Sequence, residues 1–426
     1  MNKVWTWSLH VPYILFFVWY LVASFVNVYA CDDYWHGTNV HLYGFENAQL
    51  YYWYNWEGSF THTFLATLPH IFSFERMPFI CNLISLLFLL LSVMTFLRTF
   101  YCLTRIKAFI CSCYLVAFLY TFTTGKAEIR FWVCANVTYL FGVSTTLIFL
   151  SLYHVYDYSI KKTTILILLM VVIVGNKISF VYMLFLVTIC HDIVYGRLTK
   201  KRFFFMSLSI LFLSMFNILA PGNVIRMIQN LGDSEECRMT FEEAITDRFF
   251  RLLPFVKHLF LLTPICKFLN VTISKSTIVI LTLAFVFIFV GDTTIMYLCF
   301  HDSGPMRTNI TLEVSAVLYS MSLICYFNAY LKSPKLKIIS WLLIMVFAAY
   351  GCRNMFLIKQ SYEYSRLAKE RERKVLSSND EKELFLSPLP NSGLLLSYFC
   401  NDKEWLENVY IPYYNNKTSE VFVSCE

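Results

Sequence analysis

The sequence predicts an all-α polytopic membrane protein, and three observations support this prediction. Hydrophobic residues make up 58% of the 426 residues and charged residues 15%, against roughly 45–50% and about 25% in a soluble domain. The apolar residues gather in runs of roughly 16–22, the length of a helix that crosses a bilayer core of about 30 Å. None of the runs alternates apolar with polar residues, as the strands of a membrane barrel do. This composition excludes soluble enzymes, secreted disulfide-rich domains and nucleic-acid-binding proteins.

About eleven apolar runs follow one another as candidate spans. They lie near residues 12–30, 78–97, 107–123, 133–153, 163–175, 178–195, 203–220, 250–266, 276–291, 311–330 and 338–356. The fifth run is short, which leaves open a bent or re-entrant pair with the sixth. The eighth is interrupted by Lys257 and His258. This division makes residues 1–356 a transmembrane domain and residues 357–426 a C-terminal tail.

Charge predicts the orientation of these spans. One set of connections is basic and contains Lys3, Arg98, Arg105, Lys107, Lys161, Lys162, Arg197, Lys200, Lys201, Arg202, Lys267, Lys275, Lys332, Lys335 and Lys337, with only Asp157 and Asp192 as acids. The other set contains Asp32, Asp33, Glu46, Glu57, Glu75, Glu128, Asp233, Glu235, Glu236, Glu242 and Glu243. Because cytoplasmic loops collect Lys and Arg, the basic set is predicted to be cytoplasmic. The N-terminus is then inside, and an odd number of spans places the C-terminus outside.

Three hydrophilic segments are predicted on the outer side. The first is residues 31–77, with amphipathic helical spacing, and the second is the acidic segment 221–249. The third is the tail, which opens with a charged helical stretch over 362–376 and ends in an aromatic, turn-rich segment around 405–414. A catalytic or binding site is expected among these segments rather than in the basic connections.

The first outer segment begins with two adjacent carboxylates, Asp32 and Asp33. Carboxylates at a membrane surface are costly unless they are solvated, paired or used. One of the two is predicted to be a general base that takes a proton from an acceptor hydroxyl. The other is predicted to be structural, since two close acids separate their pKa values. The sequence does not say which is the base, and a solvated acidic flank is the alternative.

Aromatic residues crowd the same segment. Trp35 and His36 adjoin the Asp pair, and further aromatic residues follow, among them Tyr51, Tyr52, Trp53, Tyr54 and Trp56. One explanation is an interfacial helix with an aromatic belt. The other is an aromatic floor for a sugar ring, which has an apolar face as well as hydroxyls. We therefore include Trp35 and His36 among the candidate substrate contacts.

Other polar residues lie at the predicted outer ends of different spans. The candidates for substrate binding are Lys126, Glu128, Arg130, Trp132, Lys177, Asn223, Arg226 and Arg307. Each basic residue alone is typical of a protein surface. Several cations on the same side as the Asp pair predict a site for a phosphate or pyrophosphate group, which Arg contacts through its planar fork and Lys as a point charge.

The sequence predicts no cofactor. It contains no Walker motif, so ATP is not expected as a direct energy source. No CxxC or Cys/His spacing suggests zinc, and most cysteines, including Cys134, lie in apolar runs, where they are expected to act as small hydrophobic residues. No metal ligand is therefore assigned, although a divalent metal requirement is left open.

Four short motifs resemble a family. They are Asp32-Asp33-Tyr34, Glu128-Ile129-Arg130-Phe131-Trp132 with Tyr139, Ala220-Pro221-Gly222-Asn223 with Arg226, and Trp405-Leu406-Glu407-Asn408 with Tyr413-Tyr414. The chain resembles GT-C type bacterial membrane glycosyltransferases, and more narrowly a group of multi-pass proteins near the GtrII-like glucosyltransferases. The resemblance implies a GT-C-like core, a catalytic Asp in the first outer loop, and a sugar donor carried on polyprenyl phosphate. The chain departs from the expected pattern at Gly175-Asn176-Lys177-Ile178-Ser179, which lacks an acidic residue.

The expected function is that of a membrane glycosyltransferase in the bacterial inner membrane. It would move a sugar from a polyprenyl-phosphate donor to a surface or lipid-linked acceptor glycan at the outer face. Two alternatives remain open. One is a flippase or exporter of lipid-linked glycans, which would also carry cationic phosphate contacts. The other is a polysaccharide polymerase, which would share the substrates but would not need the Asp pair. Internal repeats, which are frequent in transporters, are not seen in this sequence.

Overall fold

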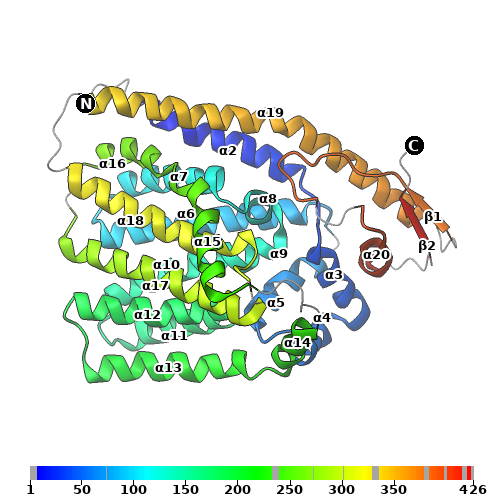
Figure 1. Ribbon diagram of the computed structural model, residues 1–426, viewed down its shortest axis with the longest axis horizontal. Helices are drawn as coiled ribbons and strands as arrows, with labels where there is room; N and C mark the ends of the chain where they lie inside the picture. Colours follow the sequence, from blue (N-terminus) through cyan, green and yellow to red (C-terminus); the bar gives the residue numbers. More distant parts are fainter. Residues whose placement is uncertain are drawn as a thin grey trace.

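The computed structural model describes residues 7–72, 74–232, 239–271, 273–300, 302–328, 335–378, 383–397, 401–414 and 420–423. Within these residues the chain is helical apart from one pair of short strands (Figure 1). The predicted all-α architecture is confirmed at this level. The charged residues Lys3, Lys332, Asp233, Glu235 and Glu236, on which part of the predicted orientation rests, lie outside the described residues.

Seven helical segments of the described chain are long and apolar enough to cross a membrane. They are α6 (Met77–Phe100), α7 (Arg105–Phe122), α9 (Val133–Ala135) with η2 (Asn136–Leu140) and α10 (Phe141–His154), α13 (Lys200–Ile218), α17 (Lys275–Phe300), η4 (Met306–Asn309) with α18 (Ile310–Asn328), and α19 (Lys335–Ser377). The protein is therefore built to be embedded in a membrane by several helices.

An eighth span is formed if a bent pair of helices counts as one. α15 (Phe241–Val256) is followed by η3 (Leu259–Leu262) and α16 (Thr263–Leu269), with an angle of 43° between the two parts. The bend falls at Lys257 and His258, the two residues that interrupt this run in the sequence. Polar residues at mid-run thus coincide with a break in the helix.

The remaining three predicted spans are helices that fall short of a bilayer core. α2 (His10–Phe25), α11 (Ile160–Val174) and α12 (Ile178–Val194) contain 16, 15 and 17 residues. At 1.5 Å per residue such helices extend about 23–26 Å, against a core of about 30 Å. By length, then, seven or eight of the eleven expected spans qualify among the described residues.

Hydroxyl side chains cap the starts of several helices. Thr104 accepts from the Lys107 amide at 3.5 Å at the start of α7, and Thr199 accepts from the Arg202 amide at 3.2 Å at the start of α13. At the start of α15, Thr240 forms a reciprocal capping box with Glu243. Such caps satisfy amide groups that the first helical turn leaves without a partner.

A buried ion pair and a tyrosine hydroxyl hold α10, α12 and α13 together. Asp192 of α12 accepts from Arg202 of α13 at 2.9 Å and from the Tyr153 hydroxyl of α10 at 2.5 Å. Both charged side chains are at least 95% buried. Asp192 was one of only two acids in the basic connections, and it serves there as a buried partner rather than as a loop acid.

The last span and the charged stretch of the tail form one helix. α19 contains 43 residues and runs along α2 before extending past the bundle (Figure 1). The boundary predicted after residue 356 lies inside this helix, because Leu357-Ile358-Lys359-Gln360-Ser361 contains no helix breaker. The tail then forms two parallel strands, β1 (Glu383–Leu386) and β2 (Glu420–Val423).

The rest of the tail returns to the first loop. That loop forms α3 (Asp32–Tyr43), α4 (Phe45–Asn55), α5 (Phe60–Thr67) and η1 (Leu68–Ile71), and the returning segment forms α20 (Lys403–Trp405), η5 (Leu406–Tyr410) and α21 (Ile411–Tyr413). Tyr34 of α3 packs against the rings of Trp405, Tyr410 and Tyr413. The tail therefore braces the helix that begins with the Asp pair.

The structure makes the predicted orientation testable with two exposed positions. Cys102 is exposed between α6 and α7, in a connection that we predict to be cytoplasmic. Tyr54 is 55% exposed on α4, on the predicted outer side. A membrane-impermeant maleimide should label Tyr54→Cys in intact spheroplasts and Cys102 only after permeabilisation, with each site read on its own peptide by mass spectrometry. The reverse pattern would invert the topology.

Candidate functional site

A pocket of about 360 Å³ lies where the first loop meets the bundle. Helices α3 and α5 supply one side, and the adjoining ends of η2, α12, α17 and η4 supply the other, together with α14 (Pro221–Gly232). Figure 1 shows α3, α4, α5 and α14 gathered at this end of the bundle. The predicted site residues that line the pocket are Asp32, Trp35, His36, Trp132, Lys177, Asn223, Arg226 and Arg307.

The two acids of the pair have different surroundings. Asp32 is exposed to the pocket, although protein surrounds it on most sides. Burial raises the pKa of Asp32, and the charges of Arg307 and Arg226 partly offset this rise. A raised pKa in an accessible carboxyl group is the property that a general base requires near neutral pH.

Asp33 is 2% exposed and does not line the pocket. Its two carboxyl oxygens accept from the backbone amides of Ala30 at 3.1 Å and Cys134 at 2.9 Å. Burial raises the pKa of Asp33 to about 8, against the effect of these hydrogen bonds. Asp33 therefore ties the start of α3 to the start of α9 and is placed to position the site rather than to contact a substrate.

Glu57 is the centre of a charge cluster that the sequence analysis did not single out. Its Oε2 atom lies 2.6 Å from Lys177 Nζ and 2.8 Å from an Arg226 guanidinium nitrogen. Burial would raise the pKa of Glu57, but the positive charges of Lys177 and Arg226 outweigh it, and the pKa falls to about 2. Glu57 is thus a permanent anion that holds two cations at the pocket.

His62 lies on the other side of Glu57, with 3.5 Å between Nε2 and Oε1. Burial, and then the charge of Lys177, lower the pKa of His62 to about 3. His62 is therefore neutral at physiological pH, and its contact with Glu57 is not an ion pair there. Burial also holds the pKa of His36 well below its ordinary value.

Both arginines of the pocket stack on tryptophan rings. The Arg226 guanidinium lies 4.7 Å from the Trp56 ring centre, and that of Arg307 lies 4.8 Å from the Trp132 ring centre. Arg307 also approaches Glu128 at 3.6 Å. Stacking restricts a guanidinium while leaving its in-plane N–H donors available. Glu128, predicted as a substrate contact, thus supports Arg307 from outside the pocket lining.

Two glycines allow the loop to approach the bundle closely. A Cβ atom on Gly58 would lie 2.0 Å from the Asn217 carbonyl oxygen, and one on Gly222 would lie 2.5 Å from the Trp56 amide nitrogen. The Gly58 amide donates to Asn223 Oδ1 at 3.0 Å. These contacts fix the segment that carries Glu57 against α14, and they place Asn223 as a structural link.

The other two predicted cations are not in the pocket lining. Arg130 is 2% exposed, donates to the Thr121 carbonyl at 3.1 Å and lies over the Trp19 ring. Lys126 is exposed at the start of the short helix α8 (Lys126–Phe131). The structure therefore brings Lys177, Arg226 and Arg307 together with Asp32 and leaves Lys126 and Arg130 elsewhere.

The part of the pocket lining that contacts α5 contains an irregular turn. Trp132 has extended backbone angles between α8 and α9, and residues 136–140 form a π-helical turn. Such turns are frequent at functional sites because they redirect side chains within a helix. Here Cys134, Thr138 and Tyr139 line the pocket. Cys134 is therefore a pocket residue and not only a small hydrophobic one.

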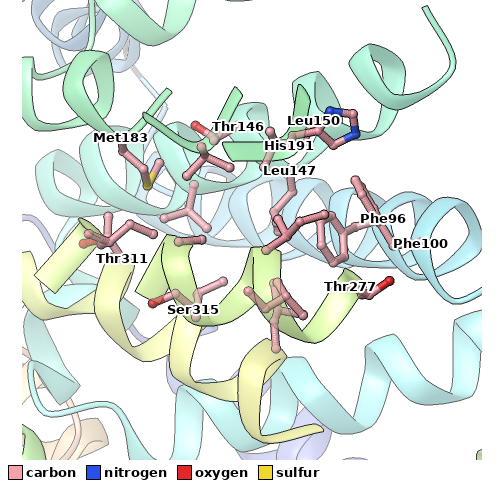
Figure 2. Close-up of a pocket in the computed structure, with 18 residues that line it drawn as sticks. Phe96, Phe100, Thr146, Leu147, Leu150, Met183, His191, Thr277, Thr311 and Ser315 are labelled. Carbon is pink, nitrogen blue, oxygen red and sulfur yellow. The ribbon is translucent and has the colours of Figure 1, made fainter. Parts of the chain in front are cut away.

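A narrow apolar cavity of about 80 Å³ lies along the same helices. Figure 2 shows side chains from α6, α10, α12, α17 and α18 around it, including Phe96, Leu147 and Met183. Ser179 and Thr308 line the pocket, whereas Met183 and Thr311, which follow them by four and three residues, line the cavity. Because residues three or four apart share a helix face, the apolar cavity and the polar pocket lie along the same faces of these segments.

Two pocket features were missed for different reasons. Glu57 lies between Trp56 and Gly58 in an aromatic stretch of the sequence. A search for an acidic partner of the predicted outer cations would have identified Glu57 as a candidate. His62 and Cys134 are 72 residues apart. No local spacing connects them, so only the folded chain brings them together.

Comparison with known proteins assigns no family. No family model matches the chain, and no curated protein sequence matches it.

Replacing Glu57 tests its role in holding the pocket. Glu57→Gln removes the buried charge that Lys177 and Arg226 share, but these two side chains are 25% and 30% exposed and regain some hydration. We expect a loss of about 1–3 kcal/mol in the free energy of unfolding, measured in detergent.

The matched control is Glu46→Gln, which changes an exposed glutamate of α4. It should change the free energy of unfolding by less than about 0.5 kcal/mol. Equal stability of both variants and the wild type would show that the Glu57 cluster does not hold the loop.

Proposed function

We propose that the chain is a bacterial inner-membrane glycosyltransferase that transfers a sugar from a polyprenyl-phosphate donor to an acceptor glycan at the outer face. The observation that carries the proposal is the meeting of Asp32 with Lys177, Arg226 and Arg307 in one pocket. The proposal includes eleven spans with a GT-C-like core, the short helices α2, α11 and α12 among them.

The cations suit the phosphate of the donor. Lys177 and Arg226 share one carboxylate oxygen of Glu57, so the pair retains about one positive charge for an anionic ligand. Arg307 adds a third cation. Preorganised cations stabilise a leaving phosphate as its charge develops, because they need not reorient during the reaction.

The apolar cavity suits the first part of a lipid tail. It is lined mostly by aliphatic and aromatic side chains, with a few polar ones such as Thr146 and His191. It shares α12 and the η4–α18 segment with the cationic pocket. A headgroup in the pocket would therefore leave its tail directed into the bundle. Trp35 and Trp56 provide aromatic surface for the sugar beside the charged groups.

The chemistry follows from these placements. The oxygen of the acceptor hydroxyl attacks the anomeric carbon of the donor sugar and forms the new glycosidic bond. The bond between that carbon and the phosphate oxygen breaks, and its electron pair leaves with the polyprenyl phosphate. The proton of the hydroxyl passes to Asp32, the accessible acid of the pair.

The alternatives use the same pocket in a different way. A flippase or exporter of lipid-linked glycans would bind the phosphate at the cations and release the lipid unchanged on the other side. A polymerase would share the donor. Only the transferase needs a base at Asp32, so substitution of this residue separates it from both alternatives.

Asp32→Asn preserves the shape of the side chain and removes its basicity. We expect transfer of labelled sugar from purified polyprenyl-phosphate donor in proteoliposomes to fall about 10²–10⁴-fold, while donor binding stays within about twofold. Glu46→Gln should retain wild-type turnover. Full activity of Asp32→Asn would remove the acid–base role, and donor translocation by wild-type protein without transfer to any acceptor would favour the flippase.

Asp33→Asn should behave differently. Both oxygens of Asp33 accept hydrogen bonds from backbone N–H groups. In the Asn variant, the side-chain NH₂ would lie against one of these backbone donors, so that hydrogen bond would be lost. We expect a loss of about 1–3 kcal/mol in the free energy of unfolding. Normal stability together with lost turnover would instead make Asp33 the base.

Filling the apolar cavity tests where the lipid tail lies. Val143 and Val187 line it, and Val187→Phe would displace about two methylene groups of a bound tail, worth about 0.8 kcal/mol each. We expect the Kd of a long-chain donor to rise about tenfold, while a short-chain water-soluble donor binds unchanged. An equal effect on both donors would place the tail elsewhere.

A further inference from the structure

We propose that His36, His62 and Cys134 bind a divalent metal ion of the borderline class, with zinc as the first candidate. The proposal does not depend on glycosyl transfer, and it departs from the sequence, which predicts no metal. The three side chains come from α3, α5 and α9, and all are buried. Their candidate ligand atoms all lie within 4.8 Å of one another.

The distances match the geometry of a tetrahedral site. Cys134 Sγ lies 3.6 Å from His36 Nε2 and 3.9 Å from His62 Nε2. In tetrahedral zinc, bonds of about 2.3 Å to sulfur and about 2.0–2.1 Å to nitrogen separate the two ligand atoms by about 3.5 Å. The two sulfur–nitrogen distances exceed this value by at most a few tenths of an ångström.

Thr138 fixes the orientation of His62. The Thr138 hydroxyl donates its one hydrogen to the Cys134 carbonyl at 2.6 Å, and its oxygen lies 2.5 Å from His62 Nδ1. That oxygen must therefore accept from His62, so Nδ1 carries the proton. His62 Nε2, which lies 3.9 Å from Cys134 Sγ and 3.5 Å from Glu57 Oε1, then carries a lone pair that can bind a metal ion.

Tyr52 supports His36 in the same way. His36 Nδ1 lies 2.9 Å from the Tyr52 hydroxyl, which also accepts from Asn39 Nδ2 at 2.9 Å. Tyr52 is completely buried. Histidines that bind metal through one ring nitrogen usually hydrogen-bond through the other, which sets the tautomer and the ring orientation. Both histidines have this outer support.

The ion would have an open coordination position. His36, His62 and Cys134 all line the pocket that contains Asp32 and the cations. Three protein ligands with a fourth position open to a pocket are characteristic of catalytic rather than structural zinc sites. The fourth ligand is a water molecule or an oxygen of a bound substrate. The competing explanation is a proton, with the Cys134 thiol donating to His36.

Metal analysis of the purified full-length protein separates an ion from a proton. After washing with metal-free buffer, wild-type protein should retain about one zinc per chain. Cobalt should replace it and give a thiolate-to-cobalt charge-transfer band. Cys134→Ala should lose both signals. Cys113→Ala, which changes a buried cysteine of α7, should keep both.

Two outcomes would overturn the proposal. One is wild-type protein that retains no zinc and gives no charge-transfer band with cobalt, which would leave the proton. The other is zinc that Cys134→Ala and wild-type protein retain equally, which would be an adventitious ion only.

A second variant keeps the proposal testable if Cys134→Ala does not fold. Tyr52→Phe retains all three ligands and removes the outer hydrogen bond to His36, together with the one from Asn39. We expect the Kd for zinc to rise about 10–100-fold, measured by chelator competition. Tyr51→Phe, at the neighbouring half-buried position of α4, should leave the Kd unchanged. An equal Kd in Tyr52→Phe and wild type would contradict binding through His36.

Discussion

Glu57 is enclosed between Lys177 and Arg226, and this ion cluster determines how the first loop meets the helix bundle. The three residues come from the α4–α5 junction, the α11–α12 connection and α14. A buried carboxylate without its partners is strongly unfavourable, so the three segments must remain together. Gly58 and Gly222 permit the close backbone approach that the cluster requires. The pocket walls are set by this contact.

The same contact explains the electrostatic character of the pocket. Two cations share one carboxylate oxygen, and a third, Arg307, is supported by Glu128 at a longer distance of 3.6 Å. The cations are held in place but not fully neutralised. The neighbouring helices also line an apolar cavity (Figure 2). A polar, cationic pocket and an apolar cavity along the same helices fit an amphiphile with an anionic headgroup, which is the class of donor that we propose.

Much of the architecture could be predicted from sequence because it depends on local composition. Apolar runs became helices, and the interruption at Lys257 and His258 became a bend. The continuous helix α19 was not anticipated, since a change from apolar to charged residues suggests a boundary, whereas backbone propensity continues across it. The number of spans stays a prediction, because α2, α11 and α12 form helices that are shorter than a bilayer core.

The sequence predicted only those parts of the site that follow from the charge of a single residue and its place in the chain. Charge alone placed Lys177, Arg226 and Arg307 on the side of the Asp pair. It could not assign Asp32 and Asp33, because successive residues in the first turn of a helix differ in direction by about 100°. It also misplaced Arg130, whose guanidinium is buried against Trp19. His36, His62 and Cys134 come together only because α3, α5 and α9 meet in the fold. No residue spacing in the sequence indicates this.

The most direct test of the account is an experimental structure of the full chain in lipid nanodiscs with a polyprenyl-phosphate sugar. The account predicts the phosphate against Arg226 and Arg307, the sugar beside Asp32, and the first part of the tail in the cavity lined by Leu147 and Met183. A donor bound on the outer surface of the bundle, with this pocket filled only by water, would contradict it.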